Sequence, residues 1–389
     1  MLGKYFDYNA TTPLREEVAS IVSENLTLFG NPSSTHSFGQ ITRKSIELAR
    51  EQVAKLIGAN NSEIVFTSGG TESINTVFKA ISTQNRVQPI HIITSKIEHS
   101  ATLEVCNHLA SQGIEVSYLS VDNNGIISME ELKQAIRHNT VLISLMYANN
   151  ETGTLQFIRT MAIEAKKIKR DIFFHVDAVQ AVGKIPINVN ELGIDALSIS
   201  SHKLYGPKGI GALYLKNLNS LPSQLIYGGG QEFGIRGGTE NVIGIIGFGE
   251  ACRIAKNELC EEYDRALKLR KYFFEKISEF DEDFKINGAI EDGRCLPNTI
   301  NIAFLNVRGE ALAALLNELY GIAISIGAAC SSEKIELSHV LLALGLSEER
   351  VKSSIRISFG HYTEYEDINY LVDSLIKTVK QLRNILPIV

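Results

Sequence analysis

The chain has 389 residues with 44% hydrophobic and 21% charged side chains, ordinary globular proportions that exclude a disordered or collagen-like protein. This length suggests about two or three domains. With 38 basic against 44 acidic residues, the net charge of −6 makes sequence-independent DNA binding a poor hypothesis, because such binding needs a dense basic surface.

Short β-branched runs alternate with helical patterns over the first two thirds of the chain. We expect strands at Ile64–Thr67, Ile90–Thr94, Val116–Leu119, Val141–Met146, Ile172–Val176, Ala196–Ser200 and Gly211–Leu215. We expect helices after the glycine turn that follows the first strand, and at Ser100–Gln112, Ser128–Arg137 and Thr160–Lys169. Such alternation predicts an α/β domain with a mainly parallel, seven-stranded sheet between helices, and ligands bind such sheets at the carboxyl ends of the strands.

The sequence changes in character after about residue 250. Helices are expected at Gly247–Ser278, Glu310–Leu319 and Glu364–Arg383, and strands at Thr299–Phe304, Ile322–Ser325 and Ile355–Phe359. We therefore predict a large domain over residues 15–255 and a smaller α+β domain formed by residues 1–14 and 256–389.

The five cysteines are odd in number and form no CxxC pair. This pattern argues against a disulfide framework and against a structural zinc site. No run of about 18 uncharged apolar residues predicts a membrane span, and the first residues lack the apolar core of a signal peptide. We therefore expect a cytoplasmic protein without a metal site.

Polar residues follow several of the predicted strands. In chain order they are Ser68–Thr71, Glu98–His99, Asn149–Glu151, Asp177–Gln180 and Ser200–Lys203. Because the carboxyl ends of parallel strands share one edge of a sheet, we expect these side chains to converge on one site. Two glycines that open a helix suit a phosphate, although a plain tight turn explains them equally well. The absence of a Walker A motif, or of GxGxxG between a strand and a helix, weakens nucleotide-fold hypotheses.

Asp177 ends one apolar strand, and Lys203 follows another. A buried carboxylate needs a partner such as a protonated ring nitrogen, and capping the next helix is the alternative. A lysine in a desolvated pocket has a lowered pKa and can bond covalently to a carbonyl compound, and a solvated surface lysine is the alternative. A phosphate cradle, such a carboxylate and such a lysine are together what pyridoxal 5'-phosphate (PLP) requires.

Three further residues are candidates for the site. His99, at a strand exit, could stack on a ring or move protons, with a structural histidine as the alternative. Cys330 lies among small and polar residues that predict an exposed, mobile loop before a helix near Ser338, which makes its thiol a candidate nucleophile. Arg356, inside an apolar strand, could bind a substrate carboxylate or form a structural ion pair.

Several motifs together resemble those of the cysteine desulfurases of the NifS/IscS type, class V of the fold-type I PLP enzymes. They run from the first residues to near the end of the chain: YFDYNATTP, FGNPSSTHSFG, FTSGGTES, KIEHSA, ANNETGT, HVDAVQAVGK, SISSHKLYGPKGIGALY, GGGQEFGIRGGTEN, AACSS, ELSHVL and SSIRISFG. The resemblance implies a PLP-dependent enzyme that converts L-cysteine to L-alanine and leaves a persulfide on Cys330.

The resemblance also implies a role for each site residue. Lys203 would bind PLP covalently, Asp177 would pair with its pyridine nitrogen, and His99 would stack on the ring and assist proton transfers. The other assignments are Gln180 to the phenolic oxygen, Gly70, Thr71, Ser200 and His202 to the phosphate with Thr239 of a partner subunit, and Asn150 and Arg356 to the substrate carboxylate.

The resemblance further implies a homodimer and a protein sulfur acceptor in iron–sulfur assembly or thiolation, reached by the loop at about residues 326–338. The loop base SIGAAC departs from the SSGSAC of many relatives, RGGT departs from RSGT, and Leu337 replaces a frequent proline. Alternatives are a selenocysteine lyase or related class V lyase, a PLP-binding sulfur-assembly scaffold without turnover and, more remotely, a cofactor-free hydrolase using Cys330 and His339.

Overall fold

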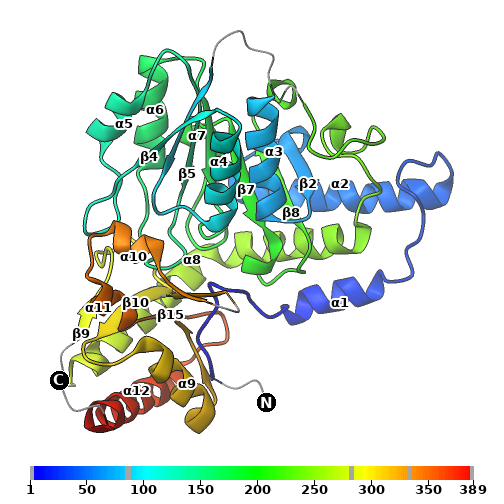
Figure 1. Ribbon diagram of the computed structural model, residues 1–389. Coiled ribbons are helices and arrows are strands. Elements are labelled where there is room, and N and C mark those ends of the chain that lie inside the picture. Colours follow the sequence, from blue (N-terminus) through cyan, green and yellow to red (C-terminus); the bar gives the residue numbers. More distant parts are fainter. Residues whose placement is uncertain are drawn as a thin grey trace.

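Two larger β-sheets, each with its own helices, form most of the described protein (Figure 1). The computed structural model describes residues 4–83, 89–221, 223–279, 284–326, 328–331 and 334–385, and for 328–331, 334–336 and 385 it describes the backbone alone. A seven-stranded sheet belongs to the first two thirds of the chain, and a four-stranded sheet belongs to the last third.

The seven-stranded sheet is parallel except for one strand. Its strands are β2 (Ile64–Thr67), β3 (His91–Ser95), β4 (Glu115–Leu119), β5 (Thr140–Met146), β6 (Phe173–Asp177), β7 (Ala196–Ser200) and β8 (Gly211–Leu215). They lie in the order β2-β8-β7-β6-β5-β3-β4, and β8 is antiparallel to both of its neighbours. The carboxyl ends of all these strands except β8 therefore share one edge of the sheet.

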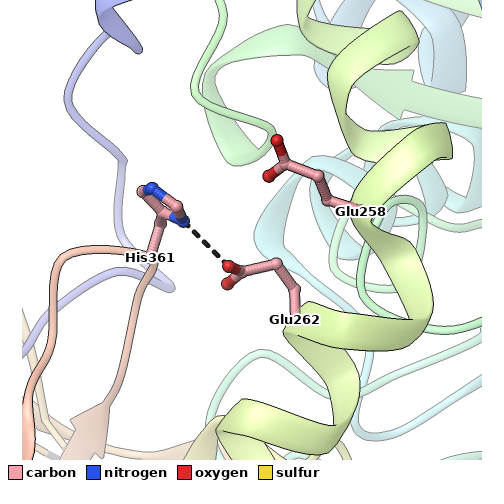
Figure 2. A group of neighbouring side chains, drawn as sticks. All are labelled: Glu258, Glu262 and His361. Carbon is pink, nitrogen blue, oxygen red and sulfur yellow. Dashed lines mark hydrogen bonds and ion pairs between the residues drawn. The ribbon is translucent and has the colours of Figure 1, made fainter.

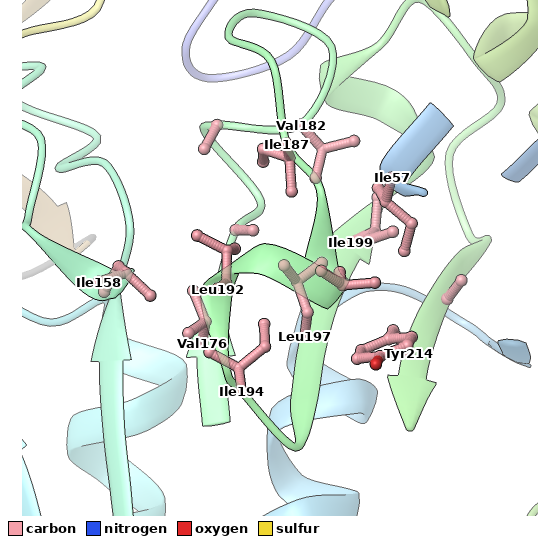
Figure 3. Close-up of a cluster of buried hydrophobic side chains, with 14 of the residues drawn as sticks. Ile57, Ile158, Val176, Val182, Ile187, Leu192, Ile194, Leu197, Ile199 and Tyr214 are labelled. Atoms are coloured by element: carbon pink, nitrogen blue, oxygen red, sulfur yellow. The ribbon is translucent and has the colours of Figure 1, made fainter. Parts of the chain in front are cut away.

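Helices cover both faces of this sheet because successive strand residues point to opposite sides. On β6, Phe173 packs into one hydrophobic layer and Phe174 into the other. The helices are α3 (Gly70–Ser82) and α4 (Ser100–Ser111) on one face, and α2 (Ser37–Ile57), α6 (Ile158–Ile168), α7 (Val189–Leu192) and the first part of α8 (Val242–Ser278) on the other. Figure 3 shows part of the second layer, where Leu197 and Ile199 of β7 lie near Ile57 of α2.

Helix α8 joins the two parts of the molecule. It is 37 residues long, and its two ends are buried in different hydrophobic clusters. Ile245 and Phe248 pack with the large sheet, whereas Leu269 and Phe273 pack with the small one. Figure 1 shows this yellow-green helix running from one sheet towards the other.

The four-stranded sheet is antiparallel, in the order β12-β15-β10-β9. Its elements are β9 (Phe284–Ile286), β10 (Thr299–Phe304), β12 (Ser325–Ile326) and β15 (Ser354–Ser358), with helices α9 (Gly309–Tyr320) and α12 (Tyr365–Ile385) packed against them. Ile302 of β10, Leu312 of α9 and Leu371 of α12 share the core of this part.

Shorter elements complete the described chain. Further helices are α1 (Glu16–Glu24), α5 (Met129–Ala135), α10 (His339–Ala343) and α11 (Glu348–Lys352), and 3-10 turns lie at Asn61–Glu63, Ser201–Lys203, Leu218–Ser220 and Glu232–Gly234. Strand β1 (Lys4–Tyr5) pairs with β11 (Ile322–Ala323), and β13 (Ala328–Ser331) pairs with β14 (Lys334–Leu337). Among the described helices, none combines the length and the apolar character that a bilayer span requires.

The predicted strands of the large sheet are confirmed, with ends shifted by at most one residue. Three predictions need correction. Ile322–Ser325, predicted as one strand, is divided between β11, which pairs with β1, and β12, which pairs with β15 of the small sheet. The long helix begins at Val242 rather than near Gly247, because glycines that weaken a helical pattern allow close packing here: a Cβ on Gly249 would lie 2.6 Å from the Cα of Ala49 in α2. The segment at residues 326–338, predicted as a loop, contains the antiparallel strands β13 and β14.

Candidate functional site

A cavity of about 660 Å³ lies at the carboxyl edge of the large sheet, and we call it the front cavity. Its volume is within the range of roughly 300–1,000 Å³ that is usual for small-molecule sites. The predicted residues that line it are Gly70, Thr71, His99, Asn150, Asp177, Gln180, Ser200, His202, Lys203 and Arg356. The strand exits therefore converge, as the sequence pattern predicts, and the small sheet adds Arg356.

The turn between β2 and α3 forms a close-fitting cradle on one side of the front cavity. Gly69 has φ +153° and ψ −175°, a conformation that only glycine adopts readily. A Cβ on Gly70 would lie 2.6 Å from a Val179 methyl group. The free N–H groups at the start of α3 and the hydroxyl of Ser200 border the same space, which suits an anionic group such as a phosphate.

Asp177 ends β6 and is 6% exposed. The backbone N–H of Val179 donates to its Oδ1 at 3.0 Å, and no ion pair to Asp177 is found among the described residues. Burial raises the pKa of this carboxyl, while the nearby His99 and Lys203 favour its ionised form. A cationic ring nitrogen would supply the charge partner that this buried carboxylate lacks.

Lys203 closes the 3-10 turn that follows β7. Its Nζ donates to two backbone carbonyls, those of Asn9 at 2.5 Å and Ala10 at 2.6 Å. Burial, with a further contribution from the positive charge of Arg356, lowers the pKa of this amine to about 8. A substantial fraction of the amine is therefore neutral and nucleophilic near physiological pH.

Two histidines of the front cavity are held neutral. His99 caps α4, and its Nδ1 accepts the backbone N–H of Ala101 at 3.1 Å, so that its proton is on Nε2. Burial lowers the pKa of His99 and lowers that of His202 to about 4. His202 Nδ1 lies 3.1 Å from the Thr11 hydroxyl. A neutral His99 can hold a proton at Nε2 without adding positive charge beside Lys203.

Arg356 is 7% exposed and lies where the small sheet meets the front cavity. Its Nη1 donates to the backbone carbonyl of Asn150 at 2.9 Å, and its Nη2 donates to Asp7 Oδ1 at 2.6 Å. Its Nε is buried without a hydrogen-bond acceptor among the described residues. The sequence left two roles open for Arg356, a structural ion pair and a binding site for a substrate carboxylate. The structure shows an ion pair with Asp7, and the same guanidinium lines the front cavity.

Asn9 was not predicted as a site residue, yet it holds the floor of the front cavity together. Its backbone carbonyl accepts Lys203 Nζ and Gln180 Nε2, and its Oδ1 accepts Lys184 Nζ. Its side-chain N–H groups donate to the Asn150 carbonyl and to a threonine of β10. The only sequence signal for Asn9 is its place in the YFDYNATTP motif, because its partners are far away along the chain.

Two predicted site residues lie apart from this group. Thr239 is exposed and does not line the front cavity. The side chain of Cys330 lies outside the described residues, while its backbone in β13 is in register with Ile335 of β14. Just beyond this hairpin, Ser338 caps α10 and donates its hydroxyl to Glu151 Oε2 at 2.5 Å. This bond ties the end of the Cys330 segment to the large sheet.

Comparison with known proteins identifies the family. The class-V aminotransferase profile matches residues 4–371. The cysteine desulfurase IscS of Dictyoglomus turgidum is 48% identical over 384 residues, which cover 98% of this chain and 96% of that protein. The chain belongs to the class-V aminotransferases, among the IscS-type cysteine desulfurases. The cysteine desulfurase IscS of Clostridium botulinum (strain Hall) is similar at 43% over 388 residues, covering 99% of this chain and 96% of that protein.

Solved structures of this family share the fold. A structure described as a NifS-like protein superposes with a TM-score of 0.89 at 38% identity, covering 98% of this chain and 99% of that one. A structure described as SspA in complex with cysteine gives a TM-score of 0.80 at 38% identity, covering 92% and 99%. The family, the fold-type I class and the PLP-dependent enzyme class predicted from the sequence are thereby confirmed.

The front cavity of this cysteine desulfurase fits PLP. Asp177 is a buried carboxylate without a cationic partner among the described residues, and Lys203 is an amine with a lowered pKa. The glycine cradle at the start of α3 suits the phosphate group. These three features are the protein groups that PLP chemistry requires.

Proposed function

We propose that this protein converts L-cysteine to L-alanine with PLP in the front cavity and keeps the sulfur as a persulfide on Cys330. The observation that carries the proposal is the convergence of Lys203, Asp177 and His99 on one cavity. This cavity brings together an amine that is partly neutral, an unpaired carboxylate and a neutral imidazole in a partly enclosed space.

The residues of the front cavity would hold PLP by its distinct ends. Lys203 would bind it covalently, Asp177 would keep the ring nitrogen protonated, His99 would stack on the ring and Gln180 would donate to the phenolic oxygen. Gly70, Thr71, Ser200 and His202 would hold the phosphate, with Asn150 beside the cofactor and Thr239 supplied by a second copy of the chain. When bound, PLP supplies an electron sink that stabilises negative charge on the substrate carbons.

The protein moves protons with groups whose pKa values suit the task. The amine of Lys203, whose pKa is about 8, takes the proton from the substrate Cα when it is neutral and returns a proton when it is charged. His99 holds its proton at Nε2, because Nδ1 is occupied by the Ala101 N–H.

Arg356 and Asn150 would bind the substrate carboxylate. Arg356 lines the front cavity, so its guanidinium can meet a substrate carboxylate there. Its Nη1 contact with the Asn150 carbonyl fixes the plane of the guanidinium. The substrate carboxylate would then share the positive charge of Arg356 with Asp7.

The sulfur step uses the thiolate of Cys330. Its sulfur attacks the sulfur of L-cysteine, a sulfur–sulfur bond forms, and the bond between the substrate sulfur and Cβ breaks with its electron pair left on carbon. Protonation of Cβ completes the methyl group of alanine. The products are L-alanine and a Cys330 persulfide, so that no external oxidant or reductant is consumed.

A homodimer and a separate sulfur acceptor complete the proposal, in a cytoplasmic setting. Support for the dimer is an exposed apolar patch around α2, where Phe29 is 77% exposed and Phe38 is 54% exposed, with ring centroids 5.1 Å apart. Contiguous exposed apolar side chains of this kind are typical of protein interfaces. The sulfur acceptor would serve iron–sulfur assembly or thiolation. We also propose that residues 15–255 form the large domain.

The test uses purified, PLP-loaded protein with L-cysteine. We expect L-alanine in solution and one added sulfur atom on Cys330 by mass spectrometry, both lost in Cys330→Ser. The matched control is Cys260→Ser, which changes an exposed thiol of α8 and should behave as the parent. No alanine from the parent, or parent-like desulfuration by Cys330→Ser, would show the proposal to be wrong. If Cys330→Ser turns over L-selenocysteine faster than it turns over L-cysteine, the result would favour a selenocysteine lyase.

A further inference from the structure

A second cavity, which we call the rear cavity, lies on the other side of Lys203. It has a volume of about 80 Å³, and Lys203 lines both cavities whereas Lys184 lines the rear one. Glu258 and Glu262 of α8 reach this region, and His361 approaches them from the segment after β15 (Figure 2). The rear cavity therefore brings several ionisable side chains close to the back of the proposed PLP site.

The carboxylates of the rear cavity are already matched by positive groups. Glu258 Oε2 lies 2.7 Å from Arg15 Nη2, and Glu262 Oε2 lies 2.9 Å from Arg265 Nη2. His361 Nδ1 is 2.8 Å from Glu262 Oε1, the contact drawn in Figure 2. A metal ion would have to displace two arginines from these carboxylates, so we assign this group to structural pairing rather than to metal binding.

Lys184 differs from these neighbours because its amine has no carboxylate within ion-pair distance among the described residues. Its Nζ donates instead to two neutral amide oxygens, Gln180 Oε1 at 2.7 Å and Asn9 Oδ1 at 3.1 Å. Burial lowers the pKa of Lys184 well below its ordinary value, and the charges of Lys203 and Arg356 lower it further. In either protonation state the amine keeps an N–H for each oxygen.

These contacts determine which end of the Gln180 amide faces the front cavity. The oxygen is held by Lys184, so the NH2 group is at the other end, where one N–H donates to the Asn9 carbonyl at 2.9 Å. Rotating the amide by 180° would place its oxygen against that carbonyl oxygen and remove the acceptor from Lys184. The second N–H is then the group that Gln180 can offer to a ligand, since Gln180 lines the front cavity.

We propose that Lys184 is a positioning residue that locks the Gln180 amide with its N–H towards the phenolic oxygen of PLP. The inference rests on the PLP site of the proposed function and deepens it, because it assigns the buried lysine behind that site. Asn9 acts with Lys184, since its carbonyl and its Oδ1 receive the donors that fix both side chains. The front cavity thereby selects a negatively charged oxygen at this place and disfavours a donor.

The test measures bound PLP in the holoenzyme of Lys184→Met. Without Lys184 only the Asn9 carbonyl fixes the Gln180 amide, so its N–H is held less firmly and the negative phenolic oxygen loses part of its hydrogen bond. We expect the pH midpoint of the visible PLP absorption to rise by about half a unit to one unit, and PLP affinity to fall about three- to tenfold. The matched control, Lys256→Met on the exposed side of α8, should leave both quantities at the parent values.

A double-mutant cycle separates this role from a structural one. If Lys184 acts through Gln180, the double variant Lys184→Met with Gln180→Ala should have the midpoint of Gln180→Ala alone. Additive shifts, or a Lys184→Met midpoint and affinity equal to the parent's, would overturn the inference. Should Lys184→Met fail to fold, Lys184→Gln is the second variant: it keeps an N–H donor, and we expect a smaller shift of the midpoint in the same direction. A parent-like midpoint in Lys184→Leu, which removes the donor, would overturn the inference.

The proposed function can fail separately. A parent protein that shows no visible absorption from PLP bound at Lys203 would contradict the PLP site itself, and the inference with it. A parent with that absorption and an unchanged Lys184→Met variant would contradict the inference alone.

Discussion

The front and rear cavities meet at Lys203, and their charged groups differ in how they are compensated. In the front cavity, the Asp177 carboxyl has no ion-pair partner among the described residues. In the rear cavity, Glu258 and Glu262 are each held by an arginine. Burying an uncompensated group costs stability, so its presence at a cavity indicates chemistry with a ligand, whereas matched charges indicate a structural connection.

Lys203→Ala should have the largest effect, because it removes the covalent attachment point of PLP and the amine that moves the substrate proton. We expect no detectable formation of L-alanine from L-cysteine, with the fold retained as judged by circular dichroism. The control is Lys216→Ala, at an exposed lysine beyond β8. If Lys203→Ala produced alanine at the parent rate, the reaction would not take place in the front cavity.

Asp177→Asn should reduce kcat by about 10²- to 10³-fold, the usual effect of deleting one electrostatic partner from an active site. The amide has the same shape and can still accept the Val179 N–H, but it has no charge to keep a ring nitrogen protonated. The measurement is the rate of alanine formation, normalised to PLP content. A variant with full PLP content and unchanged kcat would show that the charge of Asp177 has no role in the reaction, as we expect for the ion-paired carboxylates of the rear cavity.

The pKa of Lys203 predicts how the apoprotein captures PLP. Because burial lowers this pKa to about 8, the neutral fraction of the amine rises with pH up to that value and then levels off. The rate of PLP capture, trapped by borohydride reduction, should rise about tenfold from pH 6 to 7 and change little above about pH 9. Surface lysines, measured in Lys203→Ala, should continue to gain reactivity towards pH 10. If the rate of PLP capture at Lys203 also continued to rise towards pH 10, Lys203 would have the pKa of an ordinary surface lysine.

Glu262→Gln tests the rear cavity, where we expect lower stability with turnover close to the parent's. The loss of the contacts with His361 and Arg265 should cost about 1–2 kcal/mol at pH 7, since all three groups are partly exposed. Although burial opposes it, the pairing with His361 and Arg265 lowers the pKa of Glu262 to about 2. The stabilisation is therefore complete above about pH 4.5 and is lost as the pH falls towards about 2.

Urea unfolding of the parent and of Glu262→Gln at pH 7 and pH 3 measures this difference. The stability gap between the two proteins should shrink at the lower pH. A gap that is constant with pH, or a large fall in turnover without a change in stability, would mean that Glu262 is not a structural partner of His361.

Asp7→Asn should have the smallest effect, because it alters only the ion-pair partner of Arg356, the residue of the pair that lines the front cavity. Asp7 neutralises part of the charge on Arg356, and the substrate carboxylate must share that charge. Removing the competitor should lower KM for L-cysteine about two- to fivefold, which corresponds to the modest energy of a partly exposed pair. A raised KM would show that Asp7 is needed mainly to orient Arg356.

The fold could be predicted well because the strands of the large sheet are short apolar runs bounded by glycine and polar residues. The convergence of Ser200, Asp177 and His99 on one cavity also followed from strand order, since strand exits share an edge. The early start of α8 could not be predicted, because its glycines are explained by the approach of α2 rather than by local sequence.

The floor of the front cavity was beyond prediction for a different reason. Gln180 and Asn9 are 171 positions apart, and Arg356 and Asp7 are 349 apart. No local pattern marks such pairs, and the sequence motif around Asn9 signals a family without giving a contact. Lys184 was likewise invisible, because one lysine after an apolar run has no spacing that distinguishes a buried amine from a solvated one.

The contact between residues 6–9 and β15 beside the front cavity has a consequence for biosynthesis. Ser358 accepts the backbone N–H of Asn9 through its hydroxyl and donates its own N–H to the Phe6 carbonyl. Residues 6–9 are synthesised long before Ser358, so they cannot take up their place beside Lys203 until β15 has been made. A nascent chain can fold its large sheet early, but the PLP site is complete only after β15 has left the ribosome.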